Sequence, residues 1–463
     1  MENLIAIVLA LAPPVLFGAL CFNLLVPREV AGRGALVWGH GALLGLLAAT
    51  LLLRAVDMLG YGLDFNITIG ALLVLLLVLA GLNLRRRTWL SSAPATTWTI
   101  GTRLLFGLLL AFVLLRLVSL GLEILWRPLF PWDATMHWAT KAKVWFAEGS
   151  MVPFVQYNEW AELFGEGVFT DRHPEYPATI PLLQVWMNLA LGAWNESLMN
   201  LPWLVCYAAL GLLFYGHLRF AGLAAVTAMA FTYLLLSMPL LNIHVALAGY
   251  ADLFLGATYG AALMFFFHWC QDRAPWKLVA MVIFLLLCPA LKNEGTIWAA
   301  SLAPAFAAML LPRTETLKFF VLLALLVILA ILVIPNNMVI AGTTLADLLP
   351  RFNPEGLKGL LQSVWLHDNW HLQGYVLLGA VPAVVLLRER VTQHHLGFLL
   401  ALAAAAGAFL YLFLFTGFSG GAKDLSGVGR LWLHLCPGLM FMAAVFYRDL
   451  VAKDTVQDRA AKI

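Results

Sequence analysis

Charged residues are scarce in this chain. Asp, Glu, Lys and Arg make up 11% of its 463 residues, whereas hydrophobic residues make up 62%. Because a soluble globular domain carries roughly a quarter charged residues, this composition excludes an ordinary soluble protein and predicts a membrane protein. The net charge of +3 is scattered over many short loops, so it indicates no nucleic-acid partner.

The sequence also lacks cysteines spaced as metal ligands, a nucleotide-binding motif and an evident internal repeat. The five cysteines all lie in or beside apolar runs, where a cysteine behaves as a small hydrophobic residue. The glycine-rich stretch GFSGGAKDLSGVGR has no Walker pattern. The missing repeat disfavours a transporter built from inverted repeats.

Long apolar runs occur throughout the chain. A hydrocarbon core about 30 Å thick needs about 20 apolar residues per spanning helix, and these runs are too long for barrel strands. We therefore expect an all-α, polytopic membrane protein of about 13 transmembrane helices. The expected spans are residues 4–26, 35–57, 67–84, 101–125, 199–217, 222–241, 250–269, 277–291, 296–312, 318–340, 373–387, 396–416 and 431–447.

Arginines and lysines are unevenly distributed over the short loops. Under the positive-inside rule, this distribution places the N-terminus outside and the C-terminus in the cytoplasm. Residues 127–197 and 341–372 are then extracytoplasmic loops, and residues 448–463 form a cytoplasmic tail. Within the first loop, the apolar stretch 176–194 is followed by NES rather than by basic residues. We expect it to form a juxtamembrane helix at the outer leaflet.

The stretch FPWDATMHWATKAKVWF, residues 130–146, follows the fourth expected span. At 100° per residue, a helix would carry Asp133, His137 and Lys141 on one side and Trp138 and Trp145 on the other. This spacing predicts an interfacial helix with its tryptophans toward lipid and its polar groups toward water.

A structural role for the same stretch is the simpler alternative. Asp133 would then only cap the start of the helix, and Lys141 and Lys143 would contact lipid phosphates. Within the fourth span, Arg116 and Glu123 are seven residues apart on one helix face, and we expect them to pair with other groups of the bundle.

Three further polar motifs fall at the same outer level. HPEYP precedes the juxtamembrane helix, GYAD opens a span and KNEG separates two spans. Each motif alone fits a capping or snorkelling role, but together they predict a site at the extracytoplasmic interface. Their candidate residues are His173, Glu175, Tyr176, Asp252, Lys292 and Glu294.

These motifs resemble the GT-C membrane glycosyltransferases over roughly residues 101–447. An aspartate just after an outward-running helix, a long first outer loop and a basic/acidic motif between later spans carry the likeness. WDATMHWATKAKVWF, HPEYPATIPLLQ, GYADL and KNEG are similar to the bacterial protein-mannosyltransferase-like and lipid A aminoarabinose transferase branch. Residues 1–100 would be additional N-terminal transmembrane helices.

The resemblance implies a polyprenyl-phosphate-sugar-dependent glycosyltransferase of the bacterial inner membrane. It would move a sugar, with inversion, to a glycan, lipid or protein acceptor on the extracytoplasmic side, with Asp133 as general base. Asp133 is followed by Ala134 rather than by a second acid, so we expect no metal cofactor. The residues implied in substrate binding are His137, Lys141, Arg172, His173, Glu175, Tyr176, Asp252, Lys292, Glu294 and Arg430.

Two other functions fit the same sequence. One is a transporter or flippase of a lipid-linked saccharide, although such proteins usually keep ionisable groups deep in the bundle. The other is a glycan polymerase or ligase that uses the late outer loop WLHDNWHLQG, with His367, Asp368 and His371 as its candidate residues.

Overall fold

The computed structural model describes residues 2–86, 98–340, 343–349, 351–367, 369–386 and 391–460. Helices dominate this part of the chain, and the four strands are two residues long each. The first helices are α1 (Glu2–Leu25), α2 (Arg33–Val56), η1 (Asp57–Tyr61), α3 (Phe65–Arg86), α4 (Ile100–Trp126), η2 (Ala134–Ala139), α5 (Thr140–Glu148), α6 (Tyr157–Glu162), α7 (Thr179–Leu191), η3 (Leu198–Asn200), α8 (Leu201–Phe220) and α9 (Ala225–Leu236).

The remaining helices follow a bend in the chain. They are α10 (Pro239–Ala246), α11 (Asp252–Asp272), α12 (Pro275–Leu291), α13 (Glu294–Leu310), α14 (Arg313–Val333), α15 (Leu345–Leu348), α16 (Pro354–Leu361), η4 (Gln362–Leu366), α17 (Gln373–Leu386), α18 (Gln393–Phe415), α19 (Ser419–Lys423) and α20 (Val428–Ala460). Strands β1 (Phe154–Val155) and β2 (Phe169–Thr170) pair in parallel, and β3 (Val339–Ile340) and β4 (Thr343–Thr344) pair antiparallel.

Within the described residues, eight helices are long and apolar enough to cross a membrane. The number becomes nine if α9 and α10, which meet at a bend of 64°, form one broken span. The protein is therefore an all-α, multi-pass membrane protein, as expected. The count of thirteen spans stays a prediction. The eight are α1, α2 with η1, α3, α4, η3 with α8, α11, α18 and α20 as far as Ala452.

The chain separates into two compact units. Unit 1 comprises Met1–Ser237 and Leu241–Ala257, and unit 2 comprises Met238–Leu240 and Thr258–Ile463. The first three helices thus share a unit with α4 and α8, and the boundary between residues 100 and 101 stays a prediction. Helix α11 begins in unit 1 and continues in unit 2.

Close helix packing holds the N-terminal part of unit 1 together. Helix α2 contacts both α1 and α8, and glycines lie at these contacts. A Cβ atom on Gly18 would stand 1.9 Å from the carbonyl oxygen of Gly41, and one on Gly39 would stand 2.4 Å from the nitrogen of Leu213. Small residues let membrane helices approach to backbone contact, so α1 and α2 are an integral layer of this unit.

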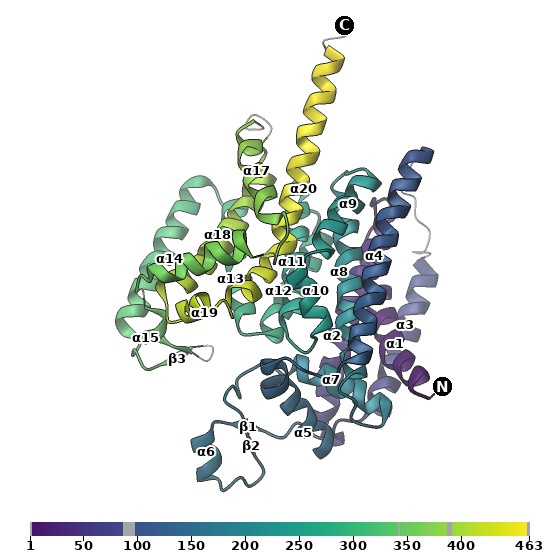
Figure 1. Ribbon diagram of the computed structural model, residues 1–463, viewed down its shortest axis with the longest axis vertical. Coiled ribbons are helices and arrows are strands. Elements are labelled where there is room, and N and C mark those ends of the chain that lie inside the picture. Colours follow the sequence, from purple (N-terminus) through teal and green to yellow (C-terminus); the bar gives the residue numbers. More distant parts are fainter. Residues whose placement is uncertain are drawn as a thin grey trace. The chain divides into compact units, whose positions relative to one another are not determined.

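The first loop folds at one end of the helices of unit 1, where α5, α6, α7 and the β1–β2 pair gather (Figure 1). The N-terminal helices support it directly. The nitrogen of Leu63 donates to the carbonyl of Gly149 over 2.7 Å, and the carboxylate of Asp57 accepts the N–H of Met151 at 3.3 Å. These bonds fix the position of the segment that follows α5.

Helix α7 lies within the stretch where the sequence predicts a juxtamembrane helix, and with 13 residues it is too short to span a membrane. Its environment differs from the expectation, because Thr179 through Asn188 are all buried inside the protein. The indole N–H of Trp186 donates to the carbonyl of Ala10 on α1 over 2.8 Å. The apolar sequence of α7 therefore serves the core beneath the loop rather than a contact with lipid.

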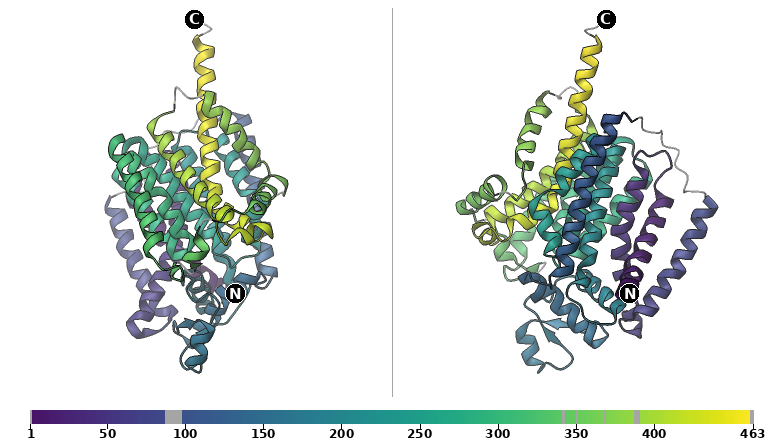
Figure 2. Two further views of the ribbon diagram at one scale, coloured as in Figure 1. Left: turned by 90° about the vertical axis from the view of Figure 1, so that its left-hand side faces the viewer. Right: turned by 45° about the vertical axis from the view of Figure 1, so that its right-hand side comes forward.

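Unit 2 contains the later helices and the second loop. The indole N–H of Trp298 on α13 donates to Nδ1 of His434 on α20 over 2.9 Å. Helix α20 is one long rod (Figure 2). It continues through the expected tail, residues 448–463, as far as Ala460, so helical structure does not stop at the end of the apolar run.

Candidate functional site

The stretch after α4 is helical but irregular. Residues Ala134–Ala139 form a π-helical turn, and α5 continues from Thr140. The Thr140 hydroxyl donates to the carbonyl of Thr135, five residues earlier, over 2.9 Å. A π turn contains more residues than an α turn, so the side chains depart from the even 100° spacing that the sequence suggested.

The tryptophans expected on the lipid side, Trp138 and Trp145, do not face lipid, which corrects the expectation. Trp138 and Trp145 are both buried in the protein. Trp145 donates its indole N–H to the carbonyl of Val152 over 2.9 Å, and Trp138 stacks on Tyr176 with ring centroids 4.9 Å apart. The loop folds back over α5 and covers the side that the sequence assigned to the membrane.

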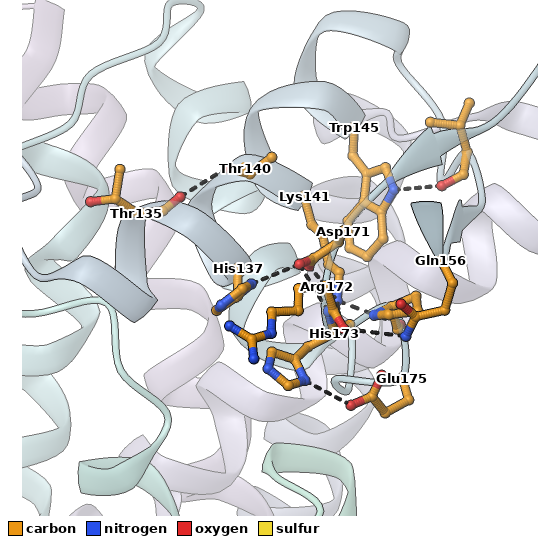
Figure 3. Close-up of polar contacts among 12 residues, drawn as sticks. Thr135, His137, Thr140, Lys141, Trp145, Gln156, Asp171, Arg172, His173 and Glu175 are labelled. Atoms are coloured by element: carbon orange, nitrogen blue, oxygen red, sulfur yellow. Dashed lines mark hydrogen bonds and ion pairs between the residues drawn. The ribbon is translucent and has the colours of Figure 1, made fainter. Parts of the chain in front are cut away.

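Asp171 lies at the centre of the polar contacts (Figure 3). Its Oδ1 accepts from Nδ1 of His137 at 2.6 Å and from the N–H of His173 at 3.0 Å, and its Oδ2 lies 3.2 Å from Nζ of Lys141. Burial raises the pKa of this carboxyl, but the N–H of His173, the His137 ring and the Lys141 ammonium outweigh it and hold the pKa below its ordinary value.

Lys141 is buried rather than open to a phosphate group. Its ammonium donates to the carbonyl of His173 over 2.5 Å and to that of Pro174 over 3.4 Å, in addition to its ion pair with Asp171. Burial lowers the pKa of Lys141, and Asp171 opposes that effect. The expected role of this residue as a phosphate ligand does not fit, because its donors are directed into the loop.

Aromatic rings form the wall beside this network. His173 and Tyr176 stack with centroids 4.7 Å apart and planes at 10°, and the His137 ring meets His173 edge-on at 4.8 Å. Nδ1 of His173 lies 3.1 Å from Oε1 of Glu175, and about a third of each of these two side chains is exposed. Arg172 is exposed and lies beside the His137 and His173 rings (Figure 3).

Asp133 stands directly before the π turn and one turn ahead of His137. It is half-buried, and its side chain makes no capping hydrogen bond to that turn. The GYAD motif lies against this point. Gly249 has φ of 107°, and a Cβ there would stand 2.7 Å from Cβ of Ala134. Only glycine combines that backbone conformation with so close an approach.

The rest of GYAD is anchored beside the same segment. The carbonyl of Tyr250 accepts from the indole N–H of Trp203 over 2.8 Å. Asp252 is fully buried in the first turn of α11, where the helix dipole favours an anion. Asp133, Asp252 and the His137–Asp171–Lys141 network therefore all belong to unit 1.

The other candidates belong to unit 2. Lys292 directly follows α12 and Glu294 begins α13, and the two form an ion pair with 3.0 Å between Nζ and Oε1. Arg430 lies in the first turn of α20. The structure thus gathers the candidates of the first loop into one cluster and places these three residues in another unit.

Asp171 is the central residue that the sequence analysis missed. No sequence motif singled it out, whereas the structure makes it the partner of His137 and Lys141. The available signal was its position at the head of DRHPEYP, where an acid precedes a basic residue and a histidine.

The late outer loop WLHDNWHLQG is described by the structure only in part. Asp368 lies outside the described residues. His367 directly follows η4, and His371 has a positive φ of 46°. Residues 369–372 form turns and a bend rather than a helix, so His371 is not part of a helix that could also carry His367. Among the described residues, no group of three or more His, Cys, Asp or Glu side chains could hold a metal ion.

Comparisons with protein-family profiles, with curated proteins and with solved structures found no match. A functional assignment must therefore come from the residues of this chain. They define a multi-pass membrane protein with an ordered carboxylate, imidazole and ammonium cluster in its first long loop.

Proposed function

We propose that the protein is a glycosyltransferase that moves a sugar from a polyprenyl-phosphate donor to an acceptor outside the cytoplasm, with inversion at the anomeric carbon. The observation that carries the proposal is the placement of Asp133. This half-buried carboxylate lies at the exit of α4, one helical turn from a preorganised His137–Asp171–Lys141 network with exposed groups beside it.

The distribution of arginines in unit 1 supports an outer position for this site. Basic residues lie where α1 and α3 end, where α2 and α4 begin and where α8 ends. The guanidinium of Arg28 donates to the carbonyl of Arg86, so two of these helix ends meet. The loop cluster lies at the opposite ends of the helices. With the basic ends in the cytoplasm, the loop is extracytoplasmic and the N-terminus is outside.

The proposed reaction uses the groups of unit 1. The acceptor hydroxyl gives its proton to Asp133 as its oxygen attacks the anomeric carbon. The bond from that carbon to the phosphate oxygen breaks, and polyprenyl phosphate leaves with the bonding electrons. Arg172 is the exposed cation suited to the leaving phosphate, and the His173 and Tyr176 rings suit the face of a sugar. Asp171 and Lys141 hold these residues in place.

A substitution in the base tests the proposal directly. We expect Asp133→Asn to lower sugar transfer by about 100-fold or more, measured in membranes with radiolabelled polyprenyl-phosphate hexose and pentose. Glu162→Gln is the matched control, because it removes an exposed carboxylate from the same loop. Near-normal transfer by Asp133→Asn would remove the assigned base.

His137 is the competing base, because Asp171 orients its ring. We expect His137→Gln to reduce transfer less than Asp133→Asn does. The reverse order would move the proton-accepting role to the imidazole. If the purified protein releases no polyprenyl phosphate from any donor, the enzymatic proposal fails as a whole. A cysteine at position 162 must also react with a membrane-impermeant reagent added from outside.

A further inference from the structure

We propose that Arg116 on α4 forms a second anion site, within the membrane, that binds the phosphate of a polyprenyl lipid. Arg116 lies ten residues before the end of α4 at Trp126, which is about 15 Å along the helix. An ionisable residue at such depth is costly and usually serves a function. The identity of this lipid rests on the proposed function, whereas the anion site does not.

The charge of Arg116 is not matched by a carboxylate. Glu123, which the sequence placed on the same face, instead pairs with Arg127 at the end of the helix, with 2.6 Å between Oε2 and Nε. Among the residues that the structure describes, none forms a hydrogen bond or ion pair with the half-buried guanidinium of Arg116. A half-buried cation at membrane depth without a counter-charge favours an anionic ligand.

A groove of about 370 Å³ opens beside this guanidinium. Its lining combines one cation, three other polar residues and apolar side chains, and it contains no acid that would compete for the arginine. The lining residues are Phe112, Leu115, Arg116, Ser119, Leu120, Tyr233 and Asn242.

The wall opposite α4 is a break in a membrane segment. Helices α9 and α10 meet at 64°, which interrupts the backbone hydrogen bonds. The carbonyl of Leu236 accepts instead from the Tyr207 hydroxyl at 2.6 Å and from the Asn242 amide at 2.9 Å. Breaks of this kind are tolerated at membrane depth where they line a cavity or a ligand site.

The chemistry of the groove fits a phosphate monoester on a single hydrocarbon chain. Guanidinium donors match phosphate oxygens in geometry and charge. Phe112, Leu115 and Leu120 offer apolar surface for the first carbons of the chain. The depth of Arg116 disfavours a two-chain phospholipid, whose glycerol and two ester groups would have to leave the headgroup layer together with the phosphate.

Binding to the full-length protein in lipid nanodiscs tests the site. A fluorescent polyprenyl phosphate is the probe, and unlabelled polyprenyl phosphate, phosphatidic acid and inorganic phosphate are competitors. We expect Arg116→Gln to weaken binding of the probe about tenfold or more and Arg116→Lys to weaken it less. Arg103→Gln is the matched control, because it removes an exposed arginine from the same helix.

Each outcome decides a specific point. Equal binding by Arg116→Gln and the unmodified protein overturns the site, and so does competition by inorganic phosphate or by phosphatidic acid as strong as that by polyprenyl phosphate. If Arg116-dependent binding is found but no donor supports transfer, the site stands and the glycosyltransferase proposal fails. If transfer requires Asp133 but binding of the probe does not depend on Arg116, the glycosyltransferase proposal stands and the Arg116 site fails.

Discussion

Lys141 and Lys292 are two buried lysines whose positive charges are paired with different kinds of carboxylate. Lys141 in unit 1 pairs with Asp171, thirty residues later, whose side chain is also buried, at 2% exposure. Lys292 in unit 2 pairs with Glu294, two residues later, whose side chain remains 25% exposed. The first pair joins two distant segments of a loop, and the second holds the turn between two helices. The difference predicts unequal consequences when each pair is broken.

The largest effect is expected for Lys141→Met. It leaves the Asp171 carboxylate buried without its ammonium partner, and loss of one member of a buried ion pair typically costs about 3–5 kcal/mol. We expect a lower apparent unfolding temperature of the detergent-solubilised protein and loss of sugar transfer. The double variant Lys141→Met with Asp171→Asn should recover part of the stability. A double variant no more stable than the single one would show that the pair does not hold the loop.

Acidification should also break the contacts that Asp171 makes with His137 and Lys141. The pKa of Asp171 in the folded protein is below its ordinary value of 3.8. Its contribution to stability is therefore complete above pH 3.8 and is lost as the pH falls below that value through the lower, folded-state pKa. We expect pepsin to cleave the first loop increasingly over that range.

Two variants distinguish the effect of protonating Asp171 from general unfolding of the protein in acid. Asp171→Asn should be cleaved readily even at the upper end of the pepsin range, with a weaker dependence on pH. Glu162→Gln removes an exposed carboxylate from the same loop and should retain the unmodified profile. An unchanged profile in Asp171→Asn would assign the acid sensitivity to other groups.

The sequence predicts some features of the two units well and others poorly. Apolar runs identify the long helices because the bilayer sets their length. Two features depend on residues that are close together in the sequence, so the sequence alone can indicate them. These are the start of α7 after HPEYP and the pairing of Lys292 with Glu294. The partner of Lys141 could not be predicted in this way, because Asp171 lies thirty residues later in the chain. The burial of Trp138 was also missed, since an interfacial helix and a covered helix have the same amphipathic pattern.

A smaller effect is expected for Lys292→Met. Glu294 is a quarter exposed and stays partly hydrated after the ammonium is removed. The loss should be about 1.5–3 kcal/mol, in the range of a hydrogen bond to a charged group. Apparent unfolding temperatures of Lys292→Met and Lys141→Met, measured side by side, check the order. A greater loss from Lys292→Met would show that the local pair is the more important of the two.

The smallest effect is expected for Lys143→Met, two residues from Lys141 on the same helix. Its ammonium lies 3.9 Å from Glu196, and both side chains are largely exposed, at 64% and 40%. Exposed ion pairs contribute about 0–1 kcal/mol because water screens them, so stability and transfer should both stay close to those of the unmodified protein. Helix propensity and the loss of one positive charge are the same in Lys143→Met and Lys141→Met. A large difference between them therefore measures burial and the contact with Asp171, whereas equal losses would mean that α5 tolerates no substitution at either position.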